Sequence, residues 1–244
     1  MRTERKMQGI IYIHVPKCGG SSFGAALRLR YLTSQATIRP GPRPDLPRTF
    51  GALTGEDRIE ADYAQRDAEL ARLVARGTRC IAAHVRYNPG LHATAACDHA
   101  HVTLLRDPVE RFVSHYRYLQ RHHPDPARAP TLEGFLDTPD APRLASQYLF
   151  YFSGRSQNRC CDLPRAIETA IASLARFTLV GDLSDPAAFA RGLRRIAGPL
   201  PRLRRNRAPS PTVIPDALRP RITQLCAPDI AIYRAALGLD RAAA

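Results

Sequence analysis

Short apolar runs alternate along the chain with longer segments in which apolar residues recur at helical spacing. A short apolar run bounded by turn residues is typical of a buried β-strand, whereas apolar residues every three or four positions are typical of a helix. We therefore predict strands at residues 9–15, 79–85, 101–106 and 177–181. We predict helices between them at residues 20–31, 56–76 and 108–120.

The third predicted helix carries clear local signals. Asp107 suits the cap of a helix and Pro108 suits its first turn. The apolar residues that follow form a single stripe at helical spacing: Val109, Phe112, Val113 and Tyr116. One face of this helix is therefore expected to pack on the core.

The order of these elements predicts the fold class. Strands separated by helices favour a parallel sheet, because a parallel neighbour needs a long crossover connection. The sequence therefore predicts a three-layer α/β fold with a central parallel sheet of four or five strands and helices on both faces. In such folds ligands bind at the carboxyl ends of the strands, so the candidate chemistry is expected there.

Length and composition favour one globular domain over residues 1–244. Hydrophobic residues make up 44% of the chain, and no apolar run approaches the about 18 residues of a membrane-spanning helix. The start, MRTERKMQGIIYIHV, has a basic head like a secretion signal, but its short apolar part ends at Pro16 and Lys17. We therefore expect a first strand, no integral membrane segment and a cytoplasmic location. The six irregularly spaced cysteines fit that reducing compartment better than a disulfide framework.

The chain is strongly basic. Its net charge is +14, and 34 of its 36 basic residues are arginines, the two lysines being Lys6 and Lys17. Between positions 186 and 221 the sequence has nine arginines and a single acidic residue, Asp216. The excess indicates an anionic partner, although an arginine-rich, solvated surface would give the same composition.

The stretch IIYIHVPKCGGSSF, residues 10–23, joins the first strand to the first helix. Its two glycines allow a tight turn, and the serines fall in the first turn of the helix, where backbone N–H groups attract a phosphate. Lys17 adds a compact positive charge. The triphosphate-binding pattern G-x-x-x-x-G-K-[ST] is not met, because here the lysine precedes the glycines. A glycine turn without a ligand is the alternative.

The stretch TLLRDPVERFVSHY, residues 103–116, repeats this arrangement at another strand end. Arg106 ends the strand and Ser114 lies two turns into the helix, so the two could meet around a second phosphate. Alternatively, Arg106 only caps the strand and Ser114 is an ordinary surface serine.

Together, HVPKCGGSSF and LLRDPVERFVSHY resemble the two nucleotide-binding motifs of the carbohydrate sulfotransferases. The similarity is to the branch of the heparan sulfate 2-O- and 6-O-sulfotransferases and their bacterial relatives. It implies a P-loop-NTPase-like version of the predicted fold and, as sulfuryl donor, 3′-phosphoadenosine-5′-phosphosulfate (PAPS). It further implies that the 5′-phosphosulfate end is held by the first motif: Lys17, Cys18, Gly19, Gly20, Ser21 and Ser22.

The same resemblance implies that Arg106 and Ser114 hold the 3′-phosphate of PAPS. Weaker similarities extend it: FTLVGDL at 177–183 resembles a late strand of the family, and RRNRAP at 204–209 resembles a loop that closes over the nucleotide. In that loop the candidate contacts are Arg205, Asn206 and Arg207.

A histidine at a strand end is the candidate base. His84 lies in CIAAHVRY, where members of this branch have a histidine that takes the proton of the acceptor hydroxyl. Histidine suits that task because its ordinary pKa lies near neutral pH. The alternatives are a merely packed His84, or His14 as the base. Lys17 would stabilise charge on the leaving oxygen during in-line sulfuryl transfer.

No metal is expected, although nearby histidines and a cysteine make a metal site conceivable: His92, Cys97, His99 and His101. Their spacing matches no zinc pattern. The acceptor, a hydroxyl on a carbohydrate or glycolipid, is expected between the loop at 39–48 and the segment SQYLFYFSG at 146–154. Gln147 and Tyr148 are candidate acceptor contacts, unless this aromatic run belongs to the core.

Two other functions compete with sulfuryl transfer. A kinase-like phosphoryl-transfer enzyme would share the fold and a phosphate-binding turn after the first strand. A noncatalytic nucleic-acid-binding protein would explain the positive charge, and its binding would depend steeply on salt. Our interpretation assigns the chain no nucleic-acid partner.

Overall fold

The computed structural model describes residues 9–40, 55–95, 98–155, 159–201 and 214–239. A parallel sheet lies at the centre, with strands in the order β2-β3-β1-β4-β5. The strands are β1 (Gly9–Ile13), β2 (Gln35–Ile38), β3 (Cys80–Ala83), β4 (His99–Leu105) and β5 (Leu179–Asp182). The predicted α/β class and parallel sheet are confirmed.

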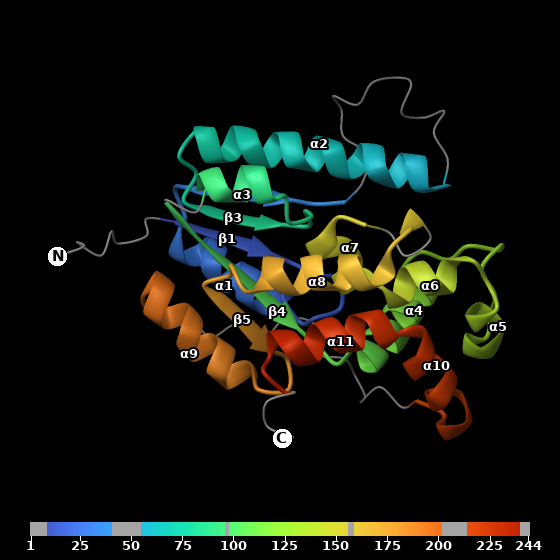
Figure 1. Ribbon diagram of the computed structural model, residues 1–244. Coiled ribbons are helices and arrows are strands. Elements are labelled where there is room, and N and C mark those ends of the chain that lie inside the picture. Colours follow the sequence, from blue (N-terminus) through green and yellow to red (C-terminus); the bar gives the residue numbers. More distant parts are fainter. Residues whose placement is uncertain (1–8, 41–54, 96–97, 156–158, 202–213, 240–244) are drawn as a thin grey trace.

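The helices cover both faces of the sheet and extend beyond its carboxyl end (Figure 1). The first half of the chain forms α1 (Ser21–Arg30), α2 (Gly55–Ala75), α3 (Pro89–Ala95) and α4 (Pro108–His122). Four more helices precede the last strand in the sequence: α5 (Leu132–Leu136), α6 (Asp140–Ala145), α7 (Gln147–Ser153) and α8 (Leu163–Leu174). The chain continues with α9 (Pro186–Ala197), the 3₁₀ turn η3 (Asp216–Leu218), α10 (Arg219–Leu225) and α11 (Ala227–Ala236).

Alternate residues of β1 build the two sides of the core, as the two-residue period of a strand requires. Ile11 and Ile13 pack with side chains from α2, α7, α8 and α11. Ile10 and Tyr12 pack on the opposite face with α1 and α9, where Leu27 is one of the contacts. A third cluster, away from the sheet, joins α4, α5, α6 and α10. The helices on both faces therefore keep β1 and its neighbours β3 and β4 buried along their whole length.

The predicted elements all occur, with ends shifted by a few residues. The strand β2 was missed because its sequence, QATI, is short and only its last residue is buried. The interpretation of residues 1–244 as one domain and the cytoplasmic location stay predictions. None of the helices in the described residues is long and apolar enough to span a bilayer.

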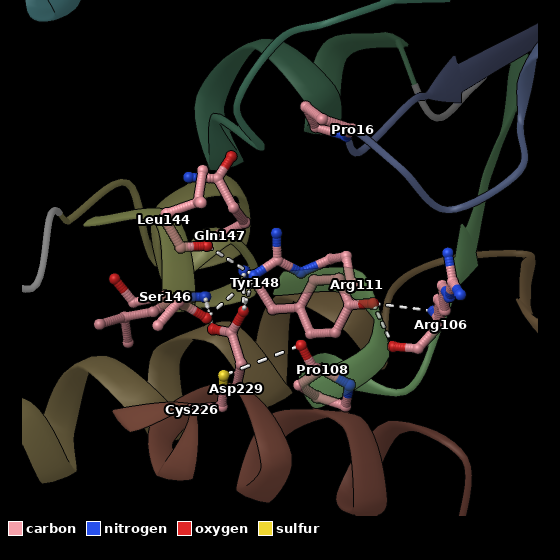
Figure 2. A network of polar contacts seen from close by, with 12 residues as sticks. Pro16, Arg106, Pro108, Arg111, Leu144, Ser146, Gln147, Tyr148, Cys226 and Asp229 are labelled. Atoms are coloured by element: carbon pink, nitrogen blue, oxygen red, sulfur yellow. Dashed lines mark hydrogen bonds and ion pairs between the residues drawn. The ribbon is translucent and has the colours of Figure 1, made fainter. Parts of the chain in front are cut away.

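A buried polar network joins the C-terminal helices to the end of the sheet (Figure 2). The Asp229 carboxylate on α11 accepts hydrogen bonds from the backbone N–H groups of Tyr148 and Leu149, at 2.8 and 2.9 Å. It also lies 3.6 Å from Arg111 Nη2, and both side chains are fully buried. Arg111 in turn donates to the carbonyl oxygens of Leu144 and Ala145, at 2.7 and 3.0 Å. The pair thus ties α4, α6, α7 and α11 together.

Burial raises the pKa of Asp229 to about 6, while Arg111 and the backbone N–H groups act in the opposite direction. The carboxyl is therefore ionised at neutral pH and balances the charge of Arg111. A buried ion pair contributes little net free energy by itself, but loss of one partner leaves a buried charge uncompensated.

We predict that Asp229→Ala lowers the free energy of unfolding by about 3–5 kcal/mol, because Arg111 would then stay buried without its counter-charge. Urea unfolding followed by circular dichroism measures this. The control is Asp185→Ala, which removes the exposed cap of α9, where the carboxylate accepts from Ala188 N at 2.8 Å. That loss should be about 1 kcal/mol. Equal losses in the two variants would show that the buried pair has no special role.

Candidate active site at the carboxyl ends of β1, β3 and β4

The first candidate turn runs from the end of β1 to the start of α1. Lys17 and Gly19 both adopt the left-handed backbone conformation, with φ values of 66° and 71°. This is common for glycine but unusual for lysine. Helix α1 then begins at Ser21, no side chain caps it at Gly20, and its first turn holds no acidic residue. The predicted strand, turn and helix are confirmed, and this helix end suits an anion.

Glycine is required at position 20 because two rings lie against its backbone. A Cβ atom there would come within 2.6 Å of His14 Nε2 and would also overlap the Tyr12 hydroxyl. Gly20 itself has an ordinary right-handed conformation, with φ −67° and ψ −12°. Close packing, and not backbone geometry, therefore excludes a side chain here.

Lys17 faces helix α4 across the site. Its Nζ atom lies 4.1 Å from the centre of the Tyr118 ring, a cation–π distance. Burial lowers the pKa of Lys17, and the charges of Arg121 and Arg106 lower it further. Several cations thus gather around this turn, and an anion bound there would be attracted by all of them.

The second candidate turn runs from the end of β4 to the start of α4. Asp107 caps the helix by accepting from Glu110 N at 2.9 Å, as predicted. The Arg106 guanidinium lies against Glu110, with Nη2 and Nε at 3.0 and 3.2 Å from Oε2. Ser114 follows one helical turn after Glu110 and so shares its side of the helix. The predicted meeting of Arg106 and Ser114 around a phosphate stays a prediction.

Tyr148 lies between the two turns and is fully buried (Figure 2). Its hydroxyl accepts from Arg106 N at 2.8 Å and donates to Arg106 O at 2.5 Å. The same hydroxyl lies 3.4 Å from Cys18 Sγ in the first turn. No surface of Tyr148 remains for an acceptor to touch, so the alternative that this aromatic run belongs to the core is confirmed and the role of Tyr148 as an acceptor contact is wrong. Gln147 donates instead to Arg143 O, at 2.9 Å, and its acceptor role stays a prediction.

Two histidines lie side by side at the ends of β1 and β3. The ring centres of His14 and His84 are 4.5 Å apart. Burial lowers the pKa of His14 to about 4, with smaller effects from Arg28 and Lys17. Burial also lowers the pKa of His84 well below its ordinary value, followed by the effects of His14 and Arg66. Both rings are therefore neutral at pH 7 and able to accept a proton.

Two further residues of the site were not selected from the sequence. His115 is largely buried on α4, and burial, followed by Arg111 and Lys17, lowers its pKa well below the ordinary value. Tyr118 contacts Lys17 as described above. The signal for Tyr118 was present in the sequence, since Glu110, Ser114 and Tyr118 are spaced four residues apart and share one side of a helix.

The remaining candidates either fall outside the described residues or lie away from the two turns. Arg205, Asn206, Arg207 and Cys97 fall outside the described residues, as does most of the loop at 39–48. The His92 and His101 rings are 4.9 Å apart, and His99 bonds to Thr78 O near the amino end of β4. Across the described ranges, no group of three or more histidine, cysteine or acidic side chains could hold a metal ion.

Comparisons with known proteins agree with this arrangement. The model of the sulfotransferase family matches residues 3–149, which contain both candidate turns. A solved sulfotransferase from Alicyclobacillus acidocaldarius is similar in structure, with 21% sequence identity and a TM-score of 0.52. The match covers 93% of this chain and 94% of that one, and it shows a shared fold. No curated protein sequence matches the chain.

We predict that Gly20→Ala lowers the free energy of unfolding by about 1–3 kcal/mol, because the new methyl group must displace Tyr12 or His14. Gly90→Ala is the matched control: Gly90 also lies at a helix start, and its nearest neighbour would be 3.6 Å from the new Cβ. That variant should be unchanged or more stable by up to about 1 kcal/mol. Thermal unfolding compares the two, and a fully stable Gly20→Ala variant would contradict the close packing described here.

Proposed function

This chain belongs to the sulfotransferase family, and we propose that it moves the sulfuryl group of PAPS to a hydroxyl of a carbohydrate or glycolipid acceptor. One observation carries the proposal. Two strand-turn-helix units, each with a basic residue at its turn, lie on the neighbouring strands β1 and β4 and are linked through the Tyr148 hydroxyl. This arrangement suits a nucleotide with phosphate groups at two ends.

The donor would lie across both turns. Its 5′-phosphosulfate end would bind the backbone N–H groups at the start of α1, together with Ser21, Ser22 and Lys17. Its 3′-phosphate would bind Arg106 and Ser114, and Arg106 would exchange its contact with Glu110 for the phosphate. We propose that Arg205, Asn206 and Arg207 complete the nucleotide site.

The transfer would proceed in line. His84 takes the proton of the acceptor hydroxyl while the acceptor oxygen forms a bond to sulfur and the bond from sulfur to the 5′-phosphate oxygen breaks. The products are a sulfate ester, adenosine 3′,5′-bisphosphate and a protonated histidine that later releases its proton. Negative charge grows on the leaving oxygen, where Lys17 and the start of α1 stabilise it.

The neutral state of His84 supports its role as the base. Its Nδ1 atom is buried and has no hydrogen-bond partner in the part of the chain that the structure describes, so an acceptor could reach it only after a local rearrangement. Burial lowers the pKa of His84 in the ligand-free protein, so the ring is unprotonated at neutral pH but is also a weaker base than an exposed histidine. A bound, multiply charged donor would raise that pKa again, because nearby negative charge favours the imidazolium.

The alternatives explain less of the site. A kinase-like enzyme would also bind phosphate at the first turn. In the usual triphosphate-binding motif, however, the lysine follows the glycines, whereas Lys17 precedes them here. A nucleic-acid-binding protein accounts for the net charge of +14, but not for two neutral histidines at the strand ends. A carbohydrate or glycolipid acceptor is proposed from the motif resemblance, and the positive charge would favour an acidic one.

The test of the function is a transfer assay with PAPS labelled in its sulfuryl group. The purified protein is incubated with heparan-type oligosaccharides, neutral sugars, glycolipids and simple alcohols, and labelled products are separated by chromatography. We expect label on at least one hydroxylated acceptor, without added metal. Transfer of phosphate from ATP, with none of sulfate from PAPS, would support the kinase-like alternative instead.

We predict that Arg106→Ala weakens binding of adenosine 3′,5′-bisphosphate by about 1.5–3 kcal/mol, the range for a hydrogen bond to a charged group. Binding of adenosine 5′-monophosphate should change little, since it lacks the 3′-phosphate. Calorimetric titration measures both. Arg221→Ala, which removes an exposed arginine paired with Asp137, should leave both affinities unchanged. Equal losses for the two nucleotides in Arg106→Ala would make Arg106 a structural residue only.

We predict that His84→Ala lowers kcat by about a hundredfold or more with donor affinity nearly unchanged, as expected when a general base is removed. His14→Ala, measured in parallel, should lower kcat less. The reverse order would identify His14 as the base, and full activity of both variants would exclude a histidine base.

The pH dependence of the wild-type rate follows from the same pKa shift. Protonation of His84 removes the base, so the rate should fall toward acidic pH. In the profile of kcat/KM for the donor, which reports the free enzyme, the fall should occur below the ordinary histidine value of 6.5 because burial lowers the pKa of His84. In the profile of kcat the fall should lie at higher pH, since the donor is then bound. A fall centred above 6.5 in kcat/KM would contradict the assignment.

A further inference from the structure

We propose that Tyr148 is a positioning residue whose hydroxyl couples the two candidate phosphate turns, so that recognition of the 3′-phosphate and alignment of the sulfuryl group occur together. This inference rests on the proposed function for its meaning, but the coupling itself is a property of the ligand-free protein. It gives the enzyme a way to favour donors that carry a 3′-phosphate.

The contacts of the hydroxyl use all of its hydrogen-bonding capacity. A tyrosine hydroxyl has one hydrogen to donate and can accept at two positions. It donates to Arg106 O and accepts from Arg106 N, at 2.5 and 2.8 Å. The second acceptor position faces Cys18 Sγ at 3.4 Å. One atom of α7 therefore touches both turns, which come from sequence positions far apart.

Protonation fixes the direction of these bonds. Burial raises the pKa of Cys18 to about 11, and it raises the pKa of Tyr148 well above its ordinary value. Both groups therefore keep their hydrogens at neutral pH. The Cys18 thiol has two acceptors within reach, the Tyr148 hydroxyl at 3.4 Å and Pro16 O at 3.7 Å. The bond to Pro16 O lies within the first turn, so only the bond to the Tyr148 hydroxyl links that turn to Arg106.

The backbone of Tyr148 is also fixed, by a hydrogen bond to α11. Its backbone N–H donates to the Asp229 carboxylate at 2.8 Å, and Arg111 lies beside that carboxylate (Figure 2). The Tyr148 hydroxyl therefore cannot follow one turn without straining its contacts with the other. Asp229 lies outside the segment 3–149 that the family model matches, so the C-terminal helices of this chain support its nucleotide site.

A functional consequence follows for the donor. When a 3′-phosphate binds Arg106, the backbone of that residue would be fixed, and the same hydroxyl would fix Cys18 at the centre of the other turn. A nucleotide that lacks the 3′-phosphate would leave the second turn without this support. The coupling therefore links donor choice to the geometry of the reacting end.

The experiment compares Tyr148→Phe with Tyr151→Phe. Both tyrosines lie on α7 and are almost fully buried, but the Tyr151 hydroxyl accepts from the Tyr63 hydroxyl, at 2.9 Å, and touches neither turn in the described part of the chain. Each variant loses one buried hydroxyl, but Tyr148→Phe also leaves Arg106 N and Arg106 O without their bonds to it, so its melting temperature should fall further. The rates of amide hydrogen exchange in the two turns of the ligand-free proteins then measure the coupling.

We expect the Arg106 amide to exchange about tenfold faster in Tyr148→Phe than in Tyr151→Phe, a factor that corresponds to about one lost hydrogen bond. The amides of residues 17–22 should also exchange faster in Tyr148→Phe, because the first turn loses its contact with the hydroxyl. By calorimetry, affinity for adenosine 3′,5′-bisphosphate should fall about tenfold in Tyr148→Phe and less than twofold in Tyr151→Phe. Faster exchange at only one turn of Tyr148→Phe, or equal exchange rates in the two variants, would overturn the proposed coupling.

A second variant keeps the test decisive if Tyr148→Phe fails to fold. Cys18→Ala removes the contacts of the thiol with the hydroxyl and with Pro16 O, but it leaves both bonds between the hydroxyl and Arg106. Exchange should therefore increase at residues 17–22 while Arg106 N stays protected. Faster exchange at both turns, or at neither, would contradict the assignment. Because exchange is measured without nucleotide, a protein that transfers no sulfate would end the proposed function but would leave the coupling result valid.

Discussion

The parallel pairing of β1 with β4 is the constraint on which the candidate site depends. The register places Ile13 beside Thr103, and the Thr103 hydroxyl donates to Ile13 O at 2.9 Å. Both strands therefore end at the same edge of the sheet, and the turns that follow them are neighbours. The next strand on the other side, β3, ends there too and contributes His84. One register thus assembles two basic turns and a neutral histidine from segments distant in sequence.

Burial explains both the rigidity and the chemistry of this edge. Apolar clusters cover both faces of β1, so its end cannot shift without disturbing the core. The same burial keeps His14 and His84 neutral and keeps the thiol and hydroxyl behind the turns protonated. The buried pair of Arg111 and Asp229 adds little net stability, but it orients the start of α7 and with it Tyr148. The candidate site therefore rests on buried, closely packed residues, and the cations Lys17, Arg106 and Arg121 lie around its first turn.

Much of this arrangement was predictable from the sequence, because it depends on local patterns. The alternation of elements predicted the parallel sheet, and the two motifs predicted the turns that follow β1 and β4. The strand β2 was missed since its four residues are mostly not buried. The contact of Arg106 with Glu110 has the local spacing i, i+4, but from the sequence we weighed only a phosphate or a strand cap for Arg106 and did not consider Glu110. The roles of Tyr148 and Asp229 could not be predicted, because they depend on contacts across 42 and 81 residues of sequence that no local pattern encodes.

A crystal structure of the protein with adenosine 3′,5′-bisphosphate would show whether the two turns hold the two phosphate groups. We expect the 5′-phosphate at the backbone N–H groups that open α1, with Lys17 beside it. We expect the 3′-phosphate on Arg106 and Ser114, with Glu110 displaced from Arg106 and the Tyr148 hydroxyl still between the turns. A nucleotide bound elsewhere, or bound with its 3′-phosphate away from Arg106 and Ser114, would show that these turns are not the donor site.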